Sequence, residues 1–338
     1  MKHIVLLDEY NEIDLKPSNL LQDYLRLTEQ DVENLLIKDQ VLTNRNCPGC
    51  HSDALATSFR KFGMRYIECA NCHSLYVSPS PNDESLVKYY KYSTSRNYWR
   101  DNISKQTRQK RKEKIIKPRF EWIKESVEEY FPHATHIVDI NTDQYGYIEE
   151  MVETSLFHRK TLLNPFLPLN DIDLSNRIQV VNTPMDDFAF EREIDVITIF
   201  EVADRKADVD NFFENIRRIL KKNGLCFMTA ILASGFDLQV LWDKADNIFP
   251  PDRLNVFSIE GLQRLFDRHD FECIELSTPG ILDVEIVEKA IQQNPQIEIP
   301  RFIEYFLKNR NVETRKSFQD FLQMNLLSSY GRILLRKK

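Results

Sequence analysis

Short apolar runs alternate with amphipathic stretches from His136 onward. The runs are rich in Ile, Val, Leu and Phe, which is typical of buried strands. Buried strands that alternate with amphipathic helices predict an α/β fold, a Rossmann-like, largely parallel sheet with helices on both faces. The strands are expected at 136–140, 160–164, 177–181, 194–200, 224–231 and 271–277.

The stretches between these runs predict three helices on the faces of the sheet. The second helix is expected to end at Asn223-Gly224, because both residues readily adopt a left-handed stop. The third is expected to begin at Ser258. Later sequence predicts a helical insertion near 280–325, followed by a last strand in 328–338 that returns to the sheet. The three helices are expected at 145–157, 207–222 and 258–270.

The first third of the chain has a different pattern. Leu, Asp and Glu recur at helical spacing near the start, where Ser18 or Thr28 is expected to cap a helix. Two prolines in "VSPSPN" close the following segment, because proline cannot continue a helix or a central strand. The expected parts are a helical lead-in at 1–43, a zinc ribbon at 44–80, an aromatic and basic helical linker at 81–131, and the α/β domain at 132–338.

The linker combines aromatic and basic residues. The aromatic residues either form a lid over a ligand or pack the ribbon onto the next domain. The basic stretch 105–119, "KQTRQKRKEKIIKPR", predicts a helix that ends near Pro118. Its charges fit either a solvated helix face or a surface for nucleic acid. The aromatic residues are Tyr89, Tyr90, Tyr92, Tyr98 and Trp99.

Two Cys-x-x-Cys pairs are the sharpest chemical signal in the chain. Cys47 and Cys50 are separated by 18 residues from Cys69 and Cys72. Four thiolates from two tight turns can surround one Zn²⁺ as a tetrahedron, and the stretch between them is long enough for a hairpin. This spacing predicts a structural zinc ribbon, with chance spacing or a disulfide as the alternative. The two other cysteines, Cys226 and Cys273, are flanked by apolar residues and are expected to be buried, reduced thiols.

Charge and apolar content narrow the classes of partner. The formal net charge of −7 argues against broad attraction to nucleic acid. No cationic leader precedes an apolar segment, and the apolar runs are too short to span a bilayer. We therefore expect a soluble, cytoplasmic protein that does not bind membranes.

Several longer stretches of sequence resemble the zinc-ribbon, class I S-adenosylmethionine-dependent methyltransferases of bacterial saccharide-biosynthesis clusters. The similarity covers most of residues 44–336. It implies a methyltransferase sheet, a structural zinc ion and S-adenosylmethionine as the cofactor. The stretches are the two cysteine pairs, "SPSP", "KPRFEWI", "IDVITIFEV", "NIRRILKKNG", "GFDLQVLWDKADNIFPPDRLNVFSIEGL", "STPGILDVEIV" and "FQDFLQMNLLSSYG".

The glycine-rich loop of that family is altered in this chain. The family loop follows the first strand and needs glycine for a sharp turn and a close approach to the cofactor. Here Asp139 closes the strand as in the family, whereas Asn141, Asp143 and Tyr145 occupy the glycine positions of "DINTDQYGYIEEM". Asn141 tolerates the turn. Tyr145 is expected to fill part of the pocket, and Asp143 to bring a negative charge to the cofactor's carboxylate.

The loops after the next two strands keep part of the implied cofactor site. The family ends its second strand with an acidic residue that holds both ribose hydroxyls, and this chain has Asn164. An amide cannot reproduce that charged bidentate contact, so weaker binding is expected. After the third strand, Asp186 or Asp187 occupies the position that contacts the adenine amino group in the family.

Residues after the fourth strand carry the implied catalytic positions. In "FEVADR", Phe200 and Glu201 match the family, where Phe200 falls beside the cofactor, but Asp204 and Arg205 replace its Glu-His pair. Histidine can act as a general base near neutral pH, whereas arginine stays protonated. The resemblance also implies histidine at Arg253 and Tyr330.

Three functions follow from these substitutions. The first is a pseudoenzyme, a binding or scaffold protein with weakened or lost cofactor binding. The second is an active C- or O-methyltransferase for a nucleotide-linked sugar or similar small acceptor, in which Glu201, Asp204 or Tyr330 replaces the base. Arg205 and Arg253 then either hold a diphosphate or form surface ion pairs with Asp204 and Asp252. The third is an RNA methyltransferase, which the net charge disfavours. A protein partner that completes the site remains open.

Overall fold

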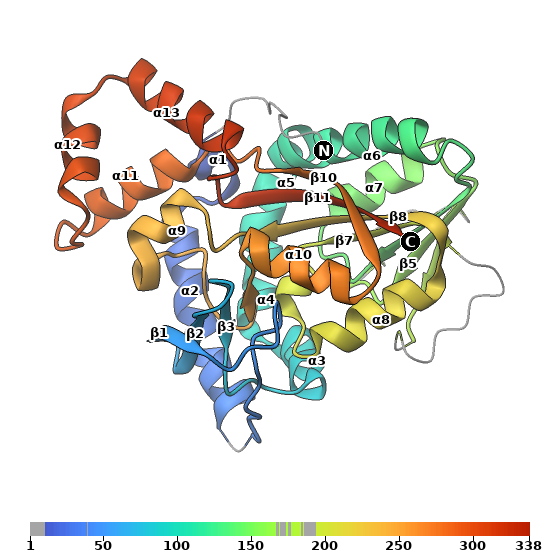
Figure 1. Ribbon diagram of the computed structural model, residues 1–338, viewed down its shortest axis with the longest axis horizontal. Coiled ribbons are helices and arrows are strands. Elements are labelled where there is room, and N and C mark those ends of the chain that lie inside the picture. Colours follow the sequence, from blue (N-terminus) through green and yellow to red (C-terminus); the bar gives the residue numbers. More distant parts are fainter. Residues whose placement is uncertain are drawn as a thin grey trace.

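The computed structural model describes residues 11–38, 40–166, 169, 174, 177–183, 185 and 194–338. Its centre is a seven-stranded sheet in the order β10-β11-β8-β7-β4-β5-β6 (Figure 1). Strands β6, β5, β4, β7 and β8 pair in parallel, and β11 pairs antiparallel with both β8 and β10. The strands are β4 His136–Ile140, β5 Arg159–Leu163, β6 Gln179–Val181, β7 Ile194–Phe200, β8 Leu220–Ile231, β10 Phe271–Ser277 and β11 Tyr330–Lys337.

This sheet confirms the predicted α/β class, with helices on both faces. Strands β4, β7 and β8 are buried on both faces, and most of their buried residues are apolar, which explains the largely apolar runs in the sequence. Helix α8, Val209–Ile219, buries Phe213 and Ile216 in the same core. Helices α6, Lys117–Tyr130, and α7, Tyr145–Glu153, contribute Ile123 and Ile148 to a second core.

The predicted end of the second helix at Asn223-Gly224 is wrong. Helix α8 ends at Ile219, and the chain enters β8 at Leu220 because Leu220 is completely buried against the sheet and pairs with Ile194. Asn223 does have a left-handed backbone, with φ of 63°. Asn223 lies inside β8, where the register against β7 shifts. Its positive φ therefore belongs to an irregularity of the strand.

The cysteine-rich segment forms a second, smaller sheet. Strands β1, Leu55–Lys61, and β2, Met64–Cys69, make the expected hairpin, and Gly63 turns it with φ of 75°. β3, Leu75–Val77, follows, and β9, Asn255–Val256, joins it from the large domain. The ribbon therefore shares a sheet with the sequence that follows the methyltransferase-like strands.

Helix α10, Ile259–Arg268, carries most of the remaining contacts to the ribbon. Ser258 caps it as predicted, with its Oγ accepting a bond from the Gly261 N–H at 2.9 Å. The Ser258 N–H donates to Ser74 Oγ at 3.0 Å, and the Ser258 hydroxyl donates to the Cys72 carbonyl. At the other end, Arg268 donates to the carbonyls of Pro48 and Gly49 at 2.8 Å each. Both cysteine turns are thus tied to one helix.

The predicted helix end near Pro118 is also wrong. Helical turns follow one another without an extended residue from Thr94 to Tyr130. Pro118 lies in the first turn of α6, directly after the wider turn η3, Lys112–Ile116. A wider turn relieves the clash between a proline ring and the preceding carbonyls, so the helix continues. The earlier segments are α3 Asp83–Tyr92, α4 Thr94–Tyr98, η2 Trp99–Ser104 and α5 Lys105–Arg111.

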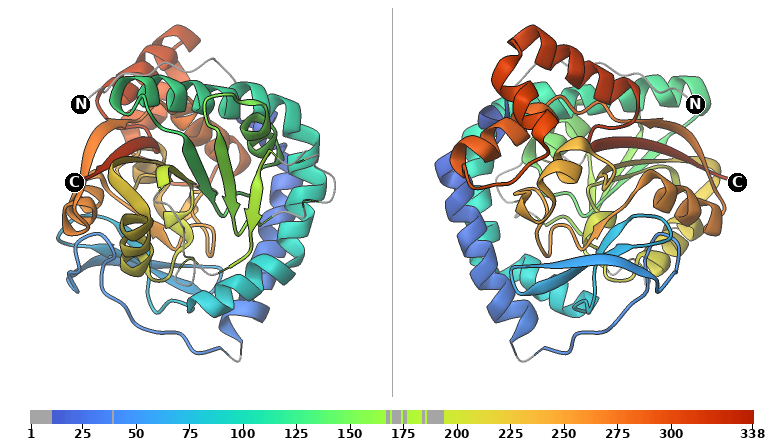
Figure 2. Two further views of the ribbon diagram at one scale, coloured as in Figure 1. Left: turned by 90° about the vertical axis from the view of Figure 1, so that its right-hand side faces the viewer. Right: turned by 60° about the vertical axis from the view of Figure 1, so that its left-hand side comes forward.

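The lead-in is helical, as predicted, but its cap differs. Helix α2, Ser18–Val32, begins at Ser18 itself, and Pro17 is the capping residue. Thr28 lies inside α2, where its hydroxyl donates to the Tyr24 carbonyl at 2.8 Å. A short helix α1, Glu12–Leu15, precedes α2, and η1, Glu33–Ile37, extends it. Helix α2 runs beside the long helical segment that includes α4 and η2 (Figure 2).

The insertion after β10 is helical and stands out from the body of the molecule (Figure 1). Its helices are α11 Asp283–Gln293, α12 Arg301–Asn309 and α13 Val312–Met324. Between β8 and β9 lie α9, Phe236–Leu241, and the short turn η5, Trp242–Lys244. Within the described part of the chain, every helix is too short or too polar to cross a membrane.

Ser258 gives a test of how the ribbon is attached. Ser258→Ala removes a helix cap and also the contacts of the Ser258 hydroxyl with Ser74 Oγ, at 3.2 Å, and with the Cys72 carbonyl, while the backbone N–H bond to Ser74 remains. We therefore expect a loss of about 2–3 kcal/mol in unfolding free energy. Asn311→Ala is the matched control, because Asn311 caps α13 in the same way and makes no such contact to the ribbon. We expect Asn311→Ala to lower the free energy of unfolding by about 1 kcal/mol. Urea unfolding measures both, and equal losses would contradict the attachment.

Candidate functional site

Three residues with left-handed backbones mark the carboxyl edge of the parallel sheet. Asn141, Asn164 and Glu201 directly follow β4, β5 and β7, and their φ angles are 57°, 48° and 58°. Each turns the chain sharply at the edge where doubly wound proteins bind their ligands. The turn that the sequence suggested Asn141 could tolerate is present.

The two asparagines hold the loops together. Asn141 Nδ2 donates to the Asn164 carbonyl at 2.9 Å, and Lys206 Nζ donates to Asn141 Oδ1 at 3.0 Å. The Asn164 side chain donates to the carbonyl of Thr183. Both amides therefore already have partners within the protein, which leaves less hydrogen-bonding capacity for a ribose.

Asp143 lies between two arginines. Its Oδ2 accepts bonds from Arg96 at 2.9 Å and from Arg205 at 2.8 Å. Arg96 comes from α4, and Arg205 ends the short turn η4, Ala203–Arg205, after β7. Burial alone raises the pKa of Asp143, but the two guanidinium groups outweigh it and hold the pKa well below its usual range. Asp143 is therefore ionised and doubly paired.

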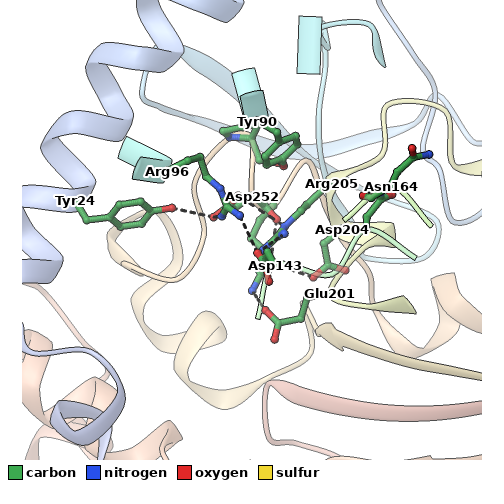
Figure 3. Close-up of polar contacts among 12 residues, drawn as sticks. Tyr24, Tyr90, Arg96, Asp143, Asn164, Glu201, Asp204, Arg205 and Asp252 are labelled. Carbon is green, nitrogen blue, oxygen red and sulfur yellow. Dashed lines mark hydrogen bonds and ion pairs between the residues drawn. The ribbon is translucent and has the colours of Figure 1, made fainter. Parts of the chain in front are cut away.

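A second carboxylate, Asp252, lies on the other side of the same arginines. Figure 3 shows both guanidinium groups converging on Asp143 and Asp252. Asp252 lies 3.9 Å from Arg96 and 3.7 Å from Arg205, and Tyr24 Oη donates to it at 3.0 Å. The four charged groups form one buried cluster, to which we refer as the Asp143 cluster. It joins α4, the loop after β4, the turn after β7 and the loop before β9.

Glu201 anchors a neighbouring set of charges. It accepts from Arg253 at 2.6 Å and from Arg119 at 3.2 Å, and Arg119 Nε also donates to Tyr330 Oη at 3.1 Å. Burial raises the pKa of Glu201, but Arg253 and Arg119 lower it to about 2. Glu201 is thus ionised, and the Tyr330 oxygen serves as an acceptor.

Two cavities meet at the Asp143 cluster. The strand-end cavity, about 910 Å³, is lined by Ile140, Asn141, Leu163 and Asn164 at the ends of β4 and β5. The lead-in cavity, about 220 Å³, is lined by residues of the lead-in together with Glu201, Arg253 and Tyr330. Only four residues line both cavities, which places them between the two spaces. They are Arg96, Trp99, Asp143 and Arg205.

Most of the residues expected from the sequence line one of these cavities. Asn141 and Asn164 line the strand-end cavity, Asp143 and Arg205 line both, and the others line the lead-in cavity or neither. Asp186 lies outside the described residues. The lead-in cavity includes Tyr145, Glu201, Arg253 and Tyr330, and the residues that line neither are Asp139, Phe200 and Asp204.

The sequence led us to expect Tyr145 to fill part of the cofactor pocket, and the structure does not place Tyr145 in the lining of the strand-end cavity. Tyr145 begins α7 and faces the lead-in cavity, where the Arg108 guanidinium lies 5.3 Å from the centre of its ring. A residue in the first helical turn points back toward the preceding segment, here α5, and so away from the ends of β4 and β5. The side chain at the cavity boundary is Asp143, whose charge the arginines neutralise.

Three candidate residues line neither cavity: Asp139 and Asp204 are buried, and Phe200 is partly buried. Asp139 accepts from Thr198 Oγ1 at 2.7 Å, and burial raises the pKa of its carboxyl to about 8. Asp204 is completely buried, and burial raises its pKa to about 7 although Arg253 opposes the rise. Phe200 packs against Tyr147 and below the Arg119 guanidinium, 4.9 Å away. None of the three side chains borders a described cavity.

Four further residues complete the site: sequence reasoning missed Arg96, Arg119 and Tyr24, and it gave Asp252 only as a surface ion-pair partner of the arginines. Arg96 lies in the linker, Arg119 belongs to "KPRFEWI", and Asp252 belongs to "PPDRLN". Tyr24 comes from the lead-in. Arg119 and Asp252 lie inside "KPRFEWI" and "PPDRLN", so a search for buried charges inside these motifs would have found both residues. Arg96 and Tyr24 carry no signal of their own in the sequence.

The four predicted zinc ligands are brought together. The Sγ atoms of the four cysteines all lie within 4.8 Å of one another. Cys47 lies 3.5 Å from Cys72, and Cys50 lies 3.5 Å from Cys69. The Asn71 N–H and side-chain amide point at Cys69 and Cys50, at 3.4 and 3.6 Å, which suits thiolate sulfur. These residues fit a closed, structural zinc site with no open position for catalysis.

Comparison with known proteins agrees with this fold. A family model described as a methyltransferase domain matches residues 49–276, which is most of the chain. The protein therefore belongs to the methyltransferase-domain family, and its sheet is that of the class I S-adenosylmethionine-dependent enzymes. No curated protein matches it significantly.

Several solved structures share the overall arrangement at low sequence identity. A candidate sarcosine dimethylglycine methyltransferase from Galdieria sulphuraria is 14% identical, with 73% of this chain and 91% of that chain covered and a TM-score of 0.42. A chain from the complex of the Haloferax volcanii Trm112 methyltransferase activator with a methyltransferase is 15% identical, with 72% and 96% covered and a TM-score of 0.43. The [4+2]-cyclase SpnF is 11% identical, with 64% and 80% covered and a TM-score of 0.40.

Metal analysis tests the cysteine cluster. We expect one equivalent of zinc in the purified protein, and Cys69→Ser should lose it together with the fold of the ribbon, because the metal supplies much of that fold's stability. Cys226→Ser is the control, since Cys226 is buried in the central sheet and should leave the zinc content unchanged. A full equivalent of zinc in Cys69→Ser would contradict the assignment.

Asp139 gives a pH test of burial. Its folded pKa of about 8 lies above the unfolded value of about 4, so the native carboxyl is protonated where the unfolded one is already ionised. The contribution of Asp139 to the free energy of unfolding is therefore fully present below about pH 4 and is lost as the pH rises toward 8. Urea unfolding measures this effect. Between pH 5 and pH 8, the free energy of unfolding should fall less for Asp139→Asn than for the native protein. Asp23→Asn, at an exposed position, should keep the native pH profile.

Proposed function

We propose that this protein is a methyltransferase-fold binding protein in which the binding of S-adenosylmethionine is weakened or lost. The observation that supports this most directly is the double ion pair of Asp143 with Arg96 and Arg205. In this fold the loop after the first strand has to stay open for the cofactor. Here the same loop carries a buried carboxylate that is already committed to two cations.

The energetic cost of opening the cluster is large. Breaking a buried ion pair costs about 3–5 kcal/mol, because it leaves a charge without compensation. A cofactor bound with micromolar affinity gains only about 8 kcal/mol in total. If the cofactor has to displace even one of these pairs, its affinity therefore falls by about 10²–10⁴-fold, since each 1.4 kcal/mol is a factor of ten.

The groups that remain do not provide an obvious base. Glu201 is held ionised by Arg253 and Arg119, which lowers its proton affinity. Arg205 occupies the histidine position and stays protonated. Asp204, the third candidate, is fully buried and borders neither cavity. Tyr330, the remaining candidate, lines the lead-in cavity, but its hydroxyl oxygen already accepts a bond from Arg119 at 3.1 Å. No histidine is thus present at the positions where the resemblance implies one.

One observation favours the alternative, an active C- or O-methyltransferase. The strand-end cavity still measures about 910 Å³, which is within the range of cofactor sites, and it lies at the expected edge of the sheet. On this alternative, Arg253 and Arg119 would hold an anionic acceptor such as a nucleotide-linked sugar, and Tyr330 would face its reacting group. The saccharide-biosynthesis setting belongs to this alternative and comes from the sequence resemblance alone.

Calorimetry with S-adenosylmethionine tests the proposal. The native protein should show no binding with a Kd below about 1 mM, which corresponds to about 4 kcal/mol. Asp143→Gly combined with Arg205→His removes one anion and one cation together and should restore measurable binding. Tyr145→Gly is the matched control and should restore nothing, because Tyr145 faces the other cavity.

Two outcomes would contradict the proposal. Micromolar binding to the native protein would favour the active enzyme. A folded double variant that binds no cofactor would show that the Asp143 cluster is not the obstruction. Thermal unfolding of both variants separates a true lack of binding from a loss of structure.

A further inference from the structure

The lead-in cavity is strongly cationic although the whole chain is acidic. Among the residues that the structure describes, its lining contains nine Arg and Lys side chains and six Asp and Glu side chains, a formal excess of three positive charges. The complete chain has a net charge of −7. The charge of this cavity is therefore a local property of the site and attracts anions into it.

Lys16 is the least compensated cation in this lining. It follows α1 at the point where the chain turns into α2, and its side chain lines the cavity. Among the described residues, the Lys16 ammonium group makes no hydrogen bond or ion pair. Burial lowers the pKa of Lys16; Glu12 opposes the shift, and the nearby cations Arg111 and Arg253 add to it. A desolvated, crowded ammonium group is the kind of cation that a bound anion stabilises.

The segment that carries Lys16 is fixed over the cavity from three sides. Arg111 of the long helical segment donates to the Leu15 carbonyl at 2.6 Å. Tyr24 donates to Asp252 of the Asp143 cluster. Glu12 pairs with Lys289 of the helical insertion at 2.9 Å. These contacts hold the lead-in in place as a wall of the cavity. The lead-in lies outside the matched methyltransferase domain, residues 49–276.

We propose that residues 12–32 cap the lead-in cavity and that Lys16 binds a small oxyanion with at least two negative charges there. Arg253 and Arg119, which line the same cavity, provide planar groups suited to phosphate or carboxylate oxygens. Leu15, Leu21 and Phe249 add an apolar wall, which suits a ligand that also has a nonpolar part. This inference deepens the proposed function by naming its ligand class, and it does not require S-adenosylmethionine to bind.

Calorimetry with inorganic pyrophosphate and with citrate tests this proposal on the full chain. We expect the native protein to bind pyrophosphate, Lys16→Met to bind it at least tenfold more weakly, and Lys16→Arg to stay within about threefold, because it keeps the charge. Lys105→Met is the matched control, since Lys105 is exposed and does not line the cavity. Citrate binding that also depends on Lys16 would extend the ligand class to carboxylates, and its absence would restrict the class to phosphates.

Two results would overturn the proposal. They are a native protein that binds neither anion, and a Lys16→Met variant that binds both as tightly as the native protein. Equal melting temperatures of the Met and Arg variants would show that a loss of affinity is not a loss of fold. The proposed function fails separately, through micromolar binding of S-adenosylmethionine, and that outcome leaves the pyrophosphate result unaffected.

Discussion

The buried contact of Asp143 with Arg96 and Arg205 is the constraint on which the rest of the site depends. A carboxylate in this position is tolerable only with full compensation, because an isolated buried charge is very costly. Arg96 and Arg205 supply that compensation, and Asp252 balances the second positive charge. The crevice of an otherwise ordinary methyltransferase sheet is thereby divided into two spaces. Asp143 in the loop after β4 and Arg205 after β7 are therefore electrostatically coupled.

The zinc ribbon contributes to this site through the loop before β9. Tyr66 of β2 donates to the Arg253 carbonyl at 2.8 Å, and the Val77 N–H of β3 donates to the Leu254 carbonyl at 2.9 Å. Arg45 donates to the same Leu254 carbonyl at 2.8 Å. The loop that presents Asp252 and Arg253 is thus bound on one side by the small sheet that carries the four cysteines. A structural zinc ion can affect the crevice in this way without touching a ligand.

Local patterns predicted the fold well and the site only in part. The strands at 194–200 and 271–277 were predicted to the residue, because short runs rich in apolar residues mark strands that are buried in a sheet. Helix and strand ends were less certain, as at Asn223 and Pro118, where burial of Leu220 and a wide helical turn overrode the local preference. The direction of Tyr145 was missed for a related reason, since side-chain direction follows from the start of α7 and not from residue type.

The sequence by itself determined which four cysteines form the cluster, the α/β class and the residues other than glycine at positions 141, 143 and 145 after β4. Each depends on spacing along the chain or on residue type, and both can be read directly. Only the tertiary structure decided what Asp143 does, because its partners lie 47 and 62 residues away. It also decided that the lead-in closes a cationic cavity, since Lys16, Arg119 and Arg253 come together only when distant segments pack. Charge compensation across such distances has no periodicity, so no local pattern records it.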